Sequence, residues 1–375
     1  MSSRAGKNQP QETDPPLKSS LPHSELSPPR GGLLLACCRS GSHLAGKVHH
    51  FYQELVSERG KLVQTPLLEQ IDFQFSDGET CVRLEQDVNG RDVFLFQALS
   101  NPLQGSNIDH NYLALMIAAR TFREWGANHV TAVVPYLAYT RQDKPTRFQR
   151  EPTTVELMAD LSLEAGIDRL ITWHPHMDRL HGYYGSIPVN ALSSLALFQD
   201  QFQEFAGRED VIAVAPDSGA LKFILDFARS LNISSGVAAK YRPRPEEAVV
   251  SEIMGDFEGK KIAILLDDMI NTGGTMAAAV QKLIRDHSIE EVYLGVSHHL
   301  GSEKALERLE TLQQDYRLQE IIVTDSVPQR DEFLSLPFTK EVSLANSLCT
   351  LIDQIHHNQP VGNWFSQGEN QPWDK

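Results

Sequence analysis

Cysteine is scarce in this chain, which has four cysteines in 375 residues. None of them is spaced as Cys-x-x-Cys, and this spacing argues against both a zinc ribbon and a disulfide framework. Thiols that neither pair nor bind zinc are typical of a reducing compartment. The sequence therefore predicts a cytoplasmic protein.

Long apolar runs and a surplus of positive charge are also missing. Stretches such as 33–38 fall far short of the roughly 20 residues that a membrane-spanning helix needs. Forty-nine acidic residues against 34 basic ones give a formal charge of -15, which opposes general attraction to nucleic acid or to an anionic lipid surface. Neither a membrane nor a nucleic acid is expected as a partner, and any basic pocket has to be local.

Both ends of the chain lack a sign of regular structure. Residues 1–30 are crowded with Ser, Pro, Gln and Lys, and they cannot bury enough apolar surface to offset the entropy of ordering, so we expect a disordered tail. A transit peptide is the competing interpretation, but such leaders are poor in acids, and Glu12, Asp14 and Glu25 do not fit. Residues 358–375 are expected to form a second, loose tail.

Between the tails, short β-type runs alternate with helical patterns. The runs are 93–97, 130–134, 169–173, 211–215, 236–239, 262–266, 292–296 and 321–324. This alternation predicts an α/β protein in which both halves are mostly parallel sheets flanked by helices. Spacing at i, i+3, i+4 and i+7 predicts two buried helix faces, Leu115, Ala118, Ala119 and Phe122 in the first half and Leu221, Ile224, Leu225 and Ala228 in the second.

A tight-turn segment at 182–185 places the division between the halves near residues 187–194. We expect an N-terminal domain over 31–188 and a C-terminal domain over 189–343. The last helix, predicted at 344–357, can return to pack on the N-terminal domain.

The sharpest local signal is an apolar strand that ends in two carboxylates and runs through a Gly/Thr loop into a helix. Asp267 and Asp268 follow the strand, and Thr272-Gly-Gly-Thr275 opens the helix. Ligands bind at the carboxyl ends of strands in open α/β sheets, and a helix N-terminus favours phosphate. The two carboxylates suit sugar hydroxyls or a hydrated magnesium ion. An Asp-capped connection without a ligand is the alternative, but the combination favours a sugar-phosphate cradle; the spacing of a Walker A loop is absent.

The segment Leu266-Asp-Asp-Met-Ile-Asn-Thr-Gly-Gly-Thr275 resembles the ribose-5-phosphate loop of the phosphoribosyl pyrophosphate synthetases and of the related phosphoribosyltransferases. Further segments resemble the synthetases in particular, namely Phe75-Ser-Asp-Gly-Glu79, Pro135-Tyr-Leu-Ala-Tyr-Thr-Arg-Gln-Asp-Lys144, Thr172-Trp-His-Pro-His176, Ala215-Pro-Asp-Ser-Gly219 and Lys240-Tyr-Arg242. The likeness spans about 31–355. It implies the ribose-phosphate diphosphokinase family, with loops closer to its archaeal-type branch, and two phosphoribosyltransferase-like domains.

The resemblance implies a ribose 5-phosphate site and a diphosphate loop. The first comprises Asp267, Asp268, Asn271, Thr272, Gly273, Gly274 and Thr275, and the second comprises Asp217, Ser218, Gly219 and Lys222. Asn271 stands where the common branch has a third carboxylate, which leaves the orientation of the ribose hydroxyl open. For the diphosphate loop, an Asp N-cap beside a surface lysine is the alternative interpretation.

The resemblance also implies an ATP site and its magnesium. The ATP contacts are Phe75, Asp77 and Glu79 from a neighbouring subunit, and Arg141, Gln142 and His176; the Mg²⁺ ligands are His176 and Asp217. A hairpin turn at Asp77-Gly78 and a solvated charged turn around Arg141 are the alternatives. Pro145-Thr146 departs from the charged run of the family. Zinc at His174-x-His176 is poorly supported, because no third ligand follows at a recognised spacing.

Lys240 and Arg242 match the K-x-R pair of the family's mobile catalytic loop. Two prolines keep residues 239–246 extended and out of a helix, so we expect a loop that can close over a substrate. A basic surface loop is the alternative.

The implied reaction moves the diphosphoryl group of ATP to the 1-hydroxyl of ribose 5-phosphate, giving phosphoribosyl pyrophosphate and AMP, with Mg²⁺ as cofactor. A shared ATP site further implies a homo-oligomer. Two alternatives remain, a catalytically silent regulatory homologue and, less favoured, a phosphoribosyltransferase.

Overall fold

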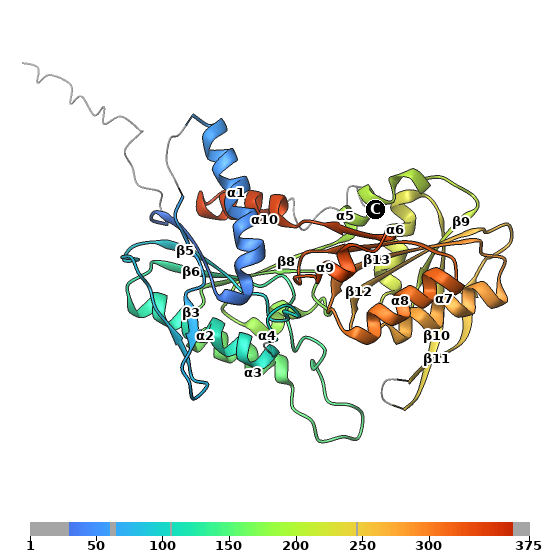
Figure 1. Ribbon diagram of the computed structural model, residues 1–375, viewed down its shortest axis with the longest axis horizontal. Coiled ribbons are helices and arrows are strands. Elements are labelled where there is room, and N and C mark those ends of the chain that lie inside the picture. Colours follow the sequence, from blue (N-terminus) through green and yellow to red (C-terminus); the bar gives the residue numbers. More distant parts are fainter. Residues whose placement is uncertain (1–29, 61–64, 106, 245–246, 363–375) are drawn as a thin grey trace, which may run out of the picture.

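The computed structural model describes residues 30–60, 65–105, 107–244 and 247–362, and for residues 240–249 it describes the backbone alone. The tail expected at 1–30 lies outside this range except for Arg30, and so do residues 363–375 of the expected second tail. Two parallel-strand sheets flanked by helices lie side by side, so the predicted α/β class is confirmed (Figure 1). No helix in the described part of the chain has the length and apolarity to cross a membrane.

The first sheet has six strands, all parallel, in the order β2-β1-β5-β6-β7-β8. The strands are β1 (Leu33–Cys37), β2 (Leu67–Leu68), β5 (Asp92–Phe96), β6 (His129–Val133), β7 (Arg169–Trp173) and β8 (Val189–Leu192). The helices of this half are α1 (Ser42–Glu58), α2 (Ile108–Glu124), α3 (Thr154–Glu164) and α4 (Leu180–Tyr184), with a 3-10 turn η1 (Arg39–Gly41). The first sheet therefore ends at Leu192, so β8 belongs to this sheet although the expected C-terminal domain begins at residue 189.

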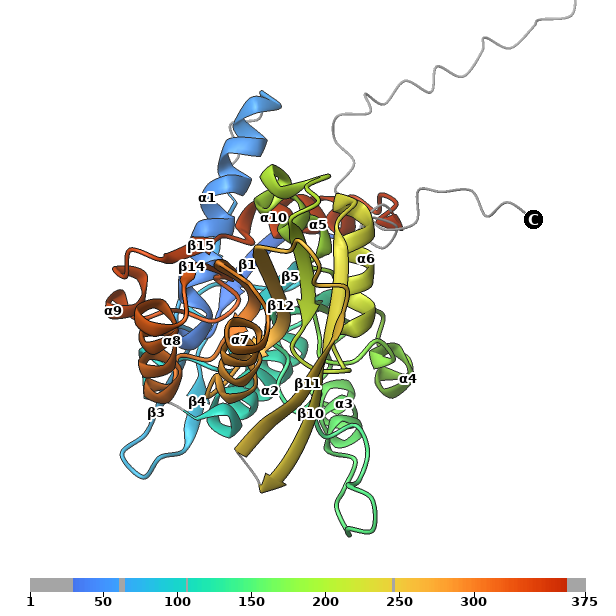
Figure 2. The ribbon, with the colours of Figure 1, turned by 90° about the vertical axis from the view of Figure 1, so that its right-hand side faces the viewer.

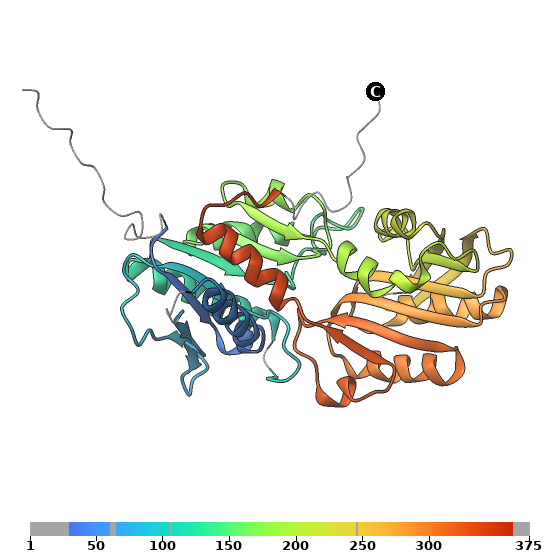
Figure 3. The same ribbon diagram turned by 90° about the horizontal axis from the view of Figure 1, so that it is seen from above.

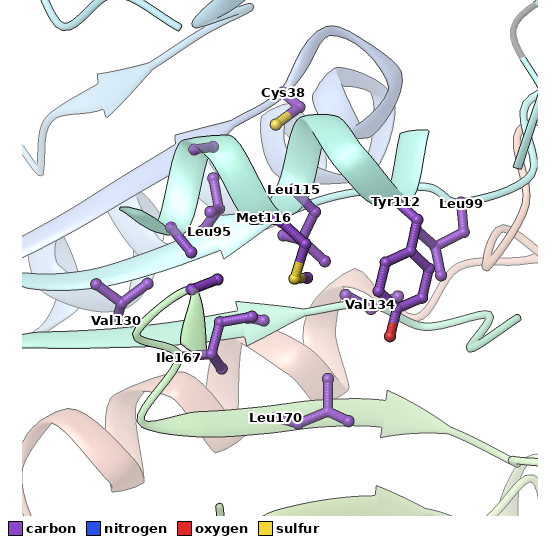
Figure 4. Packing of buried hydrophobic residues seen from close by; sticks show 14 of the residues in the cluster. Cys38, Leu95, Leu99, Tyr112, Leu115, Met116, Val130, Val134, Ile167 and Leu170 are labelled. Carbon is purple, nitrogen blue, oxygen red and sulfur yellow. The ribbon is translucent and has the colours of Figure 1, made fainter. Parts of the chain in front are cut away.

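Helices cover both faces of the first sheet, so both faces are buried. Side chains of neighbouring residues in a strand point to opposite faces. In β5, Val93 and Leu95 pack under α2 and α3, whereas Phe94 and Phe96 pack under α1 and the last helix. Figure 4 shows the α2 side, where Leu115 and neighbouring residues face the strands. The buried face predicted for this helix is confirmed.

The second sheet has seven strands in the order β11-β10-β9-β12-β13-β14-β15, and β11 alone is antiparallel to its neighbour among these described strands. The strands are β9 (Val211–Ala215), β10 (Ser234–Arg244), β11 (Glu247–Gly255), β12 (Ile262–Ile270), β13 (Glu291–His299), β14 (Leu318–Thr324) and β15 (Thr339–Val342). The helices are α5 (Leu195–Gln201), α6 (Leu221–Leu231), α7 (Gly274–Asp286), α8 (Glu303–Asp315) and α9 (Asp331–Leu334), with a 3-10 turn η2 (Gln203–Phe205). In Figure 2, α6 lies on one side of this sheet and α7 and α8 on the other.

The face predicted for the second helix is wrong at one position. Ile224 and Ala228 of α6 are buried, but Leu225 is 41% exposed. Phe227 and Leu231 take the remaining places on the buried face. The sheet meets α6 one residue further round the helix than the apolar spacing predicted.

The last helix, α10 (Ala345–His356), packs across α1 on the first half of the molecule (Figure 3). Its buried aliphatic side chains join the same cluster as Leu44 and Val48 of α1. At its end, His356 Nδ1 lies 2.8 Å from Asp92 Oδ2, and Arg59 of the α1 C-terminus pairs with Asp353 at 2.8 Å. The described part of the chain thus begins and ends on the same half.

Residues 72–82 form a small antiparallel hairpin apart from both sheets. Its strands are β3 (Asp72–Gln74) and β4 (Thr80–Val82), and β4 packs against α2. The turn between them has Gly78 at φ +95°, and the Asp77 carboxylate accepts the Glu79 N–H at 3.1 Å. The hairpin-turn interpretation of Asp77-Gly78 is therefore confirmed for the backbone, whatever its ligand role.

Candidate active site

A cleft of about 710 Å³ opens where the carboxyl ends of β7, β9 and β12 meet. It draws residues from four of the segments singled out by sequence and from both halves of the chain. The predicted residues that line it are Arg141, His176, Asp217, Gly219, Lys222, Asp267, Asp268, Asn271, Thr272, Gly273, Gly274 and Thr275. Parallel strands run in one direction, so their following loops gather at one edge of each sheet.

Strand β12 continues beyond the predicted 262–266 and includes both acids, because it stays paired with β13 as far as Ile270. Burial, together with the neighbouring negative charges of Asp268 and Asp217, raises the pKa of Asp267 well above its usual range. Burial also acts to raise the pKa of Asp268, but the hydrogen bond and charge of His176 outweigh it and lower that pKa to about 2. In this pair the Asp268 carboxyl favours its charged form, whereas the Asp267 carboxyl favours its neutral form.

His176 and Asp268 connect the two halves across the cleft. The His176 Nδ1 lies 2.6 Å from the Asp268 Oδ2. The hydrogen bond to Asp268 raises the pKa of His176, although burial opposes the rise. With Nδ1 facing the carboxylate, the Nε2 of His176 is the ring atom left to contact a ligand.

His174 has a different setting from His176. Its backbone is left-handed, at φ 38°, its ring lies 4.5 Å from that of Phe223, and its Nδ1 lies 2.5 Å from Ser297 Oγ. His298 Nε2 lies 3.1 Å from the His174 carbonyl oxygen, and burial lowers the pKa of His174. Both histidines line the cleft beyond the end of β7, and His174 is held by the second half of the chain. Sequence reasoning missed Ser297 and His298, which carry no local motif.

The loop after β12 turns into α7 at Gly273, which has φ +74° and serves as the N-cap of that helix. Residues other than glycine rarely adopt this conformation, so the position requires glycine. The N-terminus of α7, which is the positive end of the helix dipole, borders the cleft at Gly274 and Thr275. Asn271 is exposed on the same rim.

The loop after β9 closes on itself through Asp217, whose Oδ1 accepts the Gly219 N–H at 2.9 Å. Helix α6 begins after it, with Ala220 as N-cap, so the alternative that Asp217 caps this helix is wrong. Lys222 pairs with Asp178 at 3.4 Å, and both side chains are exposed. Ser218 is exposed but does not line the cleft within the described residues.

The residues predicted for ATP are only partly brought together. Arg141 lines the cleft, whereas Gln142 lies outside the lining and its Oε1 accepts the Thr154 hydroxyl at 2.6 Å. Phe75 and Glu79 belong to the β3–β4 hairpin and are outside the lining as well. Phe75 is 51% exposed and meets another ring edge-on, that of Phe73 at 5.3 Å.

Lys240 and Arg242 lie on β10, whose backbone pairs with β11 in a long hairpin. The expected irregular loop is therefore wrong for 239–244, which are in a strand, and residues 245 and 246 lie outside the described part. Pro243 falls in a register shift between residues 241 and 244, where a strand can accommodate a proline. An extended backbone, as predicted, is compatible with a strand.

Among the described residues, one further group of side chains of the kinds that bind metal ions lies outside the cleft. The ligand atoms of His43, Asp325 and Glu341 lie within 4.8 Å of one another. The Lys47 ammonium lies 2.9 Å from Asp325 and 3.3 Å from Glu341. A side-chain cation therefore already neutralises these carboxylates, and the group joins α1 to the second half of the chain.

Comparisons with known proteins agree with this geometry. Residues 36–166 match the model of the N-terminal domain of ribose phosphate pyrophosphokinase, and residues 229–366 match the phosphoribosyl synthetase-associated domain. The ribose-phosphate pyrophosphokinase of a Marinomonas species is 33% identical over 78% of this chain and 89% of its own length. The ribose-phosphate pyrophosphokinase of Caldanaerobacter subterraneus is 34% identical over 78% of this chain and 88% of its own length.

A solved structure supports the same relationship. The crystal structure of phosphoribosylpyrophosphate synthetase from Mycobacterium smegmatis superposes with a TM-score of 0.72 and 28% identity, covering 87% of this chain and 99% of the other. The two family models include Arg141 and the loop after β12, whereas the cleft segments after β7 and β9 lie between the two matched ranges. The chain therefore belongs to the ribose-phosphate pyrophosphokinase family.

Proposed function

We propose that this protein transfers the diphosphoryl group of ATP to the 1-hydroxyl of ribose 5-phosphate, which gives phosphoribosyl pyrophosphate and AMP. One observation carries the proposal: the Gly/Thr loop at the start of α7 and the His176–Asp268 pair lie in a single cleft between the two halves. A sugar phosphate bound at the loop would present its 1-hydroxyl toward groups suited to a metal-bound nucleotide. Membership of the family supports the same reaction.

The ribose 5-phosphate end is built from β12 and the turn into α7. Thr272, Gly273, Gly274 and Thr275 offer backbone N–H groups and hydroxyls to the 5-phosphate. Asp267 and Asp268 are acceptors for ribose hydroxyls, and Asp268 keeps its charge because His176 stands beside it. Asn271 supplies an amide on the rim, at the position where the resemblance implies a carboxylate in the common branch of the family.

The residues of the cleft fit a magnesium ion. Mg²⁺ usually takes one or two protein ligands and completes its octahedron with water and substrate phosphates, so a complete cage of side chains is not required. His176 donates Nδ1–H to a carboxylate and leaves Nε2 for a metal, an arrangement common among metal-binding histidines. His176 and Asp217 would hold the ion. When bound, Mg²⁺ neutralises charge on the ATP phosphates.

The chain's own cations act on the transferring group. Lys222 and the loop that begins at Asp217 would receive the diphosphate, and Arg141 would grip the ATP phosphates from the other half. Lys240 and Arg242, on the β10–β11 hairpin, would stabilise charge on the transferred group and on the departing AMP. In phosphoryl transfer, positioning and charge stabilisation supply nearly all of the rate enhancement.

The nucleotide site would be completed by a second subunit. Phe75, Asp77 and Glu79 lie on an exposed hairpin outside the cleft of their own chain, which supports a role in a neighbour's site. A homo-oligomer follows. We further place the protein in the cytoplasm, because all four cysteines are free thiols and three of them are buried.

A direct assay tests the reaction. Purified protein with Mg²⁺, ATP and ribose 5-phosphate should release AMP and form phosphoribosyl pyrophosphate in equal amounts. Omission of ribose 5-phosphate should abolish AMP release, which separates transfer from simple ATP hydrolysis. Absence of AMP with the complete mixture would favour a catalytically silent regulatory homologue. Activity that requires a nucleobase and phosphoribosyl pyrophosphate instead would indicate a phosphoribosyltransferase.

A further inference from the structure

Two consecutive carbonyl groups of the loop after β12 are held from outside the cleft. The Asn271 carbonyl accepts the hydroxyl of Ser302, and the Thr272 carbonyl accepts Nη1 of Arg308 at 2.5 Å. Both donors belong to the N-terminal part of α8, on the far side of the loop from the cleft lining. Ser302 is also the N-cap of α8, since its Oγ accepts the Ala305 N–H at 3.2 Å.

Peptide geometry fixes what these two contacts do to the loop. All peptide bonds among the described residues are trans. In a trans peptide, the carbonyl and the N–H of the next residue point in opposite directions. With the carbonyls of Asn271 and Thr272 directed at α8, the N–H groups of Thr272 and Gly273 are directed away from it. Residues 271–276 line the cleft and no described residue of α8 does, so these N–H groups face the cleft.

The loop is also pressed against α8. A Cβ built on Gly273 would lie 3.8 Å from the Cα of Ala305 and 3.8 Å from the Cδ of Arg308, which is ordinary van der Waals distance. Just upstream, the Ile270 carbonyl accepts the Leu300 N–H at 2.9 Å. The segment from 300 to 308 thus supports three consecutive residues of the loop. A run of N–H groups ending at a left-handed glycine is a common anion-binding arrangement.

Arg308 adds charge to this geometry. Its guanidinium is a planar cation with several N–H donors. It therefore places a positive charge directly behind the peptide whose N–H faces the cleft, in addition to the positive end of the α7 dipole. The half-buried guanidinium is separated from a ligand by the loop itself, so it acts through the backbone rather than by contact.

We propose that Arg308 and Ser302 are positioning residues of the 5-phosphate site, which hold the peptides at 271–273 so that their N–H groups meet the phosphate of ribose 5-phosphate. This inference rests on the proposed function. The proposal adds to the 5-phosphate site two residues that sequence reasoning did not find and that contact neither substrate.

The decisive variant is Arg308→Met, which keeps a long apolar stem and removes charge and donors. Loss of a charged hydrogen bond in this position should raise the KM for ribose 5-phosphate about ten- to hundredfold. The KM for Mg²⁺-ATP and the kcat should stay within about twofold, since the nucleotide is held elsewhere. Arg308→Lys, which keeps the charge and one donor, should recover part of the lost affinity.

Ser302 provides a second, independent pair of variants. Ser302→Ala removes both the cap and the contact with the Asn271 carbonyl, whereas Ser302→Thr retains the hydroxyl. The alanine variant should raise the KM for ribose 5-phosphate several-fold, on the scale of one neutral hydrogen bond, and the threonine variant should remain near wild type. Arg285→Met, at the far end of α7 where Arg285 donates to Tyr316, is the matched control and should leave both KM values unchanged.

Different results would contradict the proposed function and the positioning role of Arg308. If the wild-type protein releases no AMP with ribose 5-phosphate, the proposed function is wrong. If the wild-type protein is active and Arg308→Met is folded by thermal unfolding, an unchanged KM for ribose 5-phosphate overturns the positioning role. An equal rise in both KM values, or a fall in kcat alone, overturns it as well. Direct titration of ribose 5-phosphate without ATP should show the same loss of affinity as the KM.

Discussion

The ribose side and the nucleotide side of the cleft differ in how completely one chain provides them. Every residue predicted for ribose 5-phosphate lines the same cleft, and the backbone of the loop after β12 is held by α8. On the nucleotide side, Arg141 and His176 line the cleft, whereas Gln142 and the Phe75 hairpin do not. Under the proposed function, the sugar phosphate would meet a site already in place, while the nucleotide would require groups that come from elsewhere.

The difference follows from where each residue sits in the topology. The ribose residues come from one strand and the helix directly after it, so the register of β12 in the sheet fixes them together. The residues predicted for ATP come from a separate hairpin and from two connecting loops of the first half, and the predicted catalytic pair comes from β10, near the edge of the second sheet. Elements at the edge of a sheet have fewer neighbours to fix them, and a second subunit or a ligand can complete their surroundings.

The largest expected effect is on the transferring group. Lys240→Ala should lower kcat about 10³-fold or more, because a cation that stabilises the transition state in phosphoryl transfer can contribute about 10³ to 10⁵ in rate. Binding of ribose 5-phosphate, measured by calorimetry without ATP, should stay within about twofold of wild type. Equal loss of turnover and of ribose 5-phosphate binding would show that the hairpin serves the ribose side, and the contrast between the two sides would be lost.

A smaller effect is expected at the Phe75 hairpin. Phe75→Ala should raise the KM for ATP about ten- to hundredfold, the range for loss of one stacked base, and leave the KM for ribose 5-phosphate unchanged. Oligomers assembled from Phe75→Ala and Lys240→Ala chains then test whether the site is shared. If a site takes Phe75 from the neighbour, about a quarter of the sites in random mixtures have both residues intact, and activity returns at low ATP.

The control for this experiment is the same pair of variants mixed without exchange of subunits. Recovery should appear after co-expression and be absent when the separately purified oligomers are combined for a short time. No recovery after co-expression, with mixed oligomers verified by two affinity tags, would place both residues in the site of one chain.

The smallest effect concerns stability and pH. Asp268 has a lowered pKa, so its contribution to stability is present above the ordinary Asp value and is lost as the pH falls through about 2. His176 has a raised pKa, so its contribution is complete below its ordinary value and is lost as the pH rises through the raised one. The pair should therefore stabilise the fold most between about pH 4 and 6.5, by less than about 1 kcal/mol because the imidazole is partly exposed.

This window is accessible to thermal unfolding without magnesium. The Tm of the wild-type protein should exceed that of His176→Gln most clearly near pH 5, and the difference should shrink at alkaline pH. A difference in Tm that stays constant from pH 5 to pH 9 would show that the ring acts by packing alone. His50→Gln, on the exposed surface of α1, is a suitable control histidine.

Much of the fold could be predicted from local patterns. A buried parallel strand needs an apolar run, and the predicted runs at 169–173 and 211–215 coincide with β7 and β9. Strand length was harder to predict: β12 continues through Asp267 and Asp268 because β13 pairs with it there, although charged residues rarely extend an apolar strand. Leu225 faces solvent for a similar reason, since the exact rotation of α6 depends on the sheet beneath it.

The candidate site divides in the same way. Residues that share a strand and its following loop, such as those from Asp267 to Thr275, form a recognisable string because they are neighbours in the chain. Ser297 beside His174, and Arg308 behind Thr272, are more than thirty positions from their partners in sequence. No string contains such contacts, so local patterns could not reveal them.

The sequence by itself determined the class of the fold and the chemistry of the loops, because apolar alternation, glycines and paired acids act over a few neighbouring residues. Tertiary structure alone decided that His176 lies against Asp268, that the 72–82 hairpin stands apart from the cleft, and that α8 supports the loop after β12. The physical reason is that these relations depend on how two sheets are placed against each other. That placement is fixed by packing across the whole core rather than by any one segment.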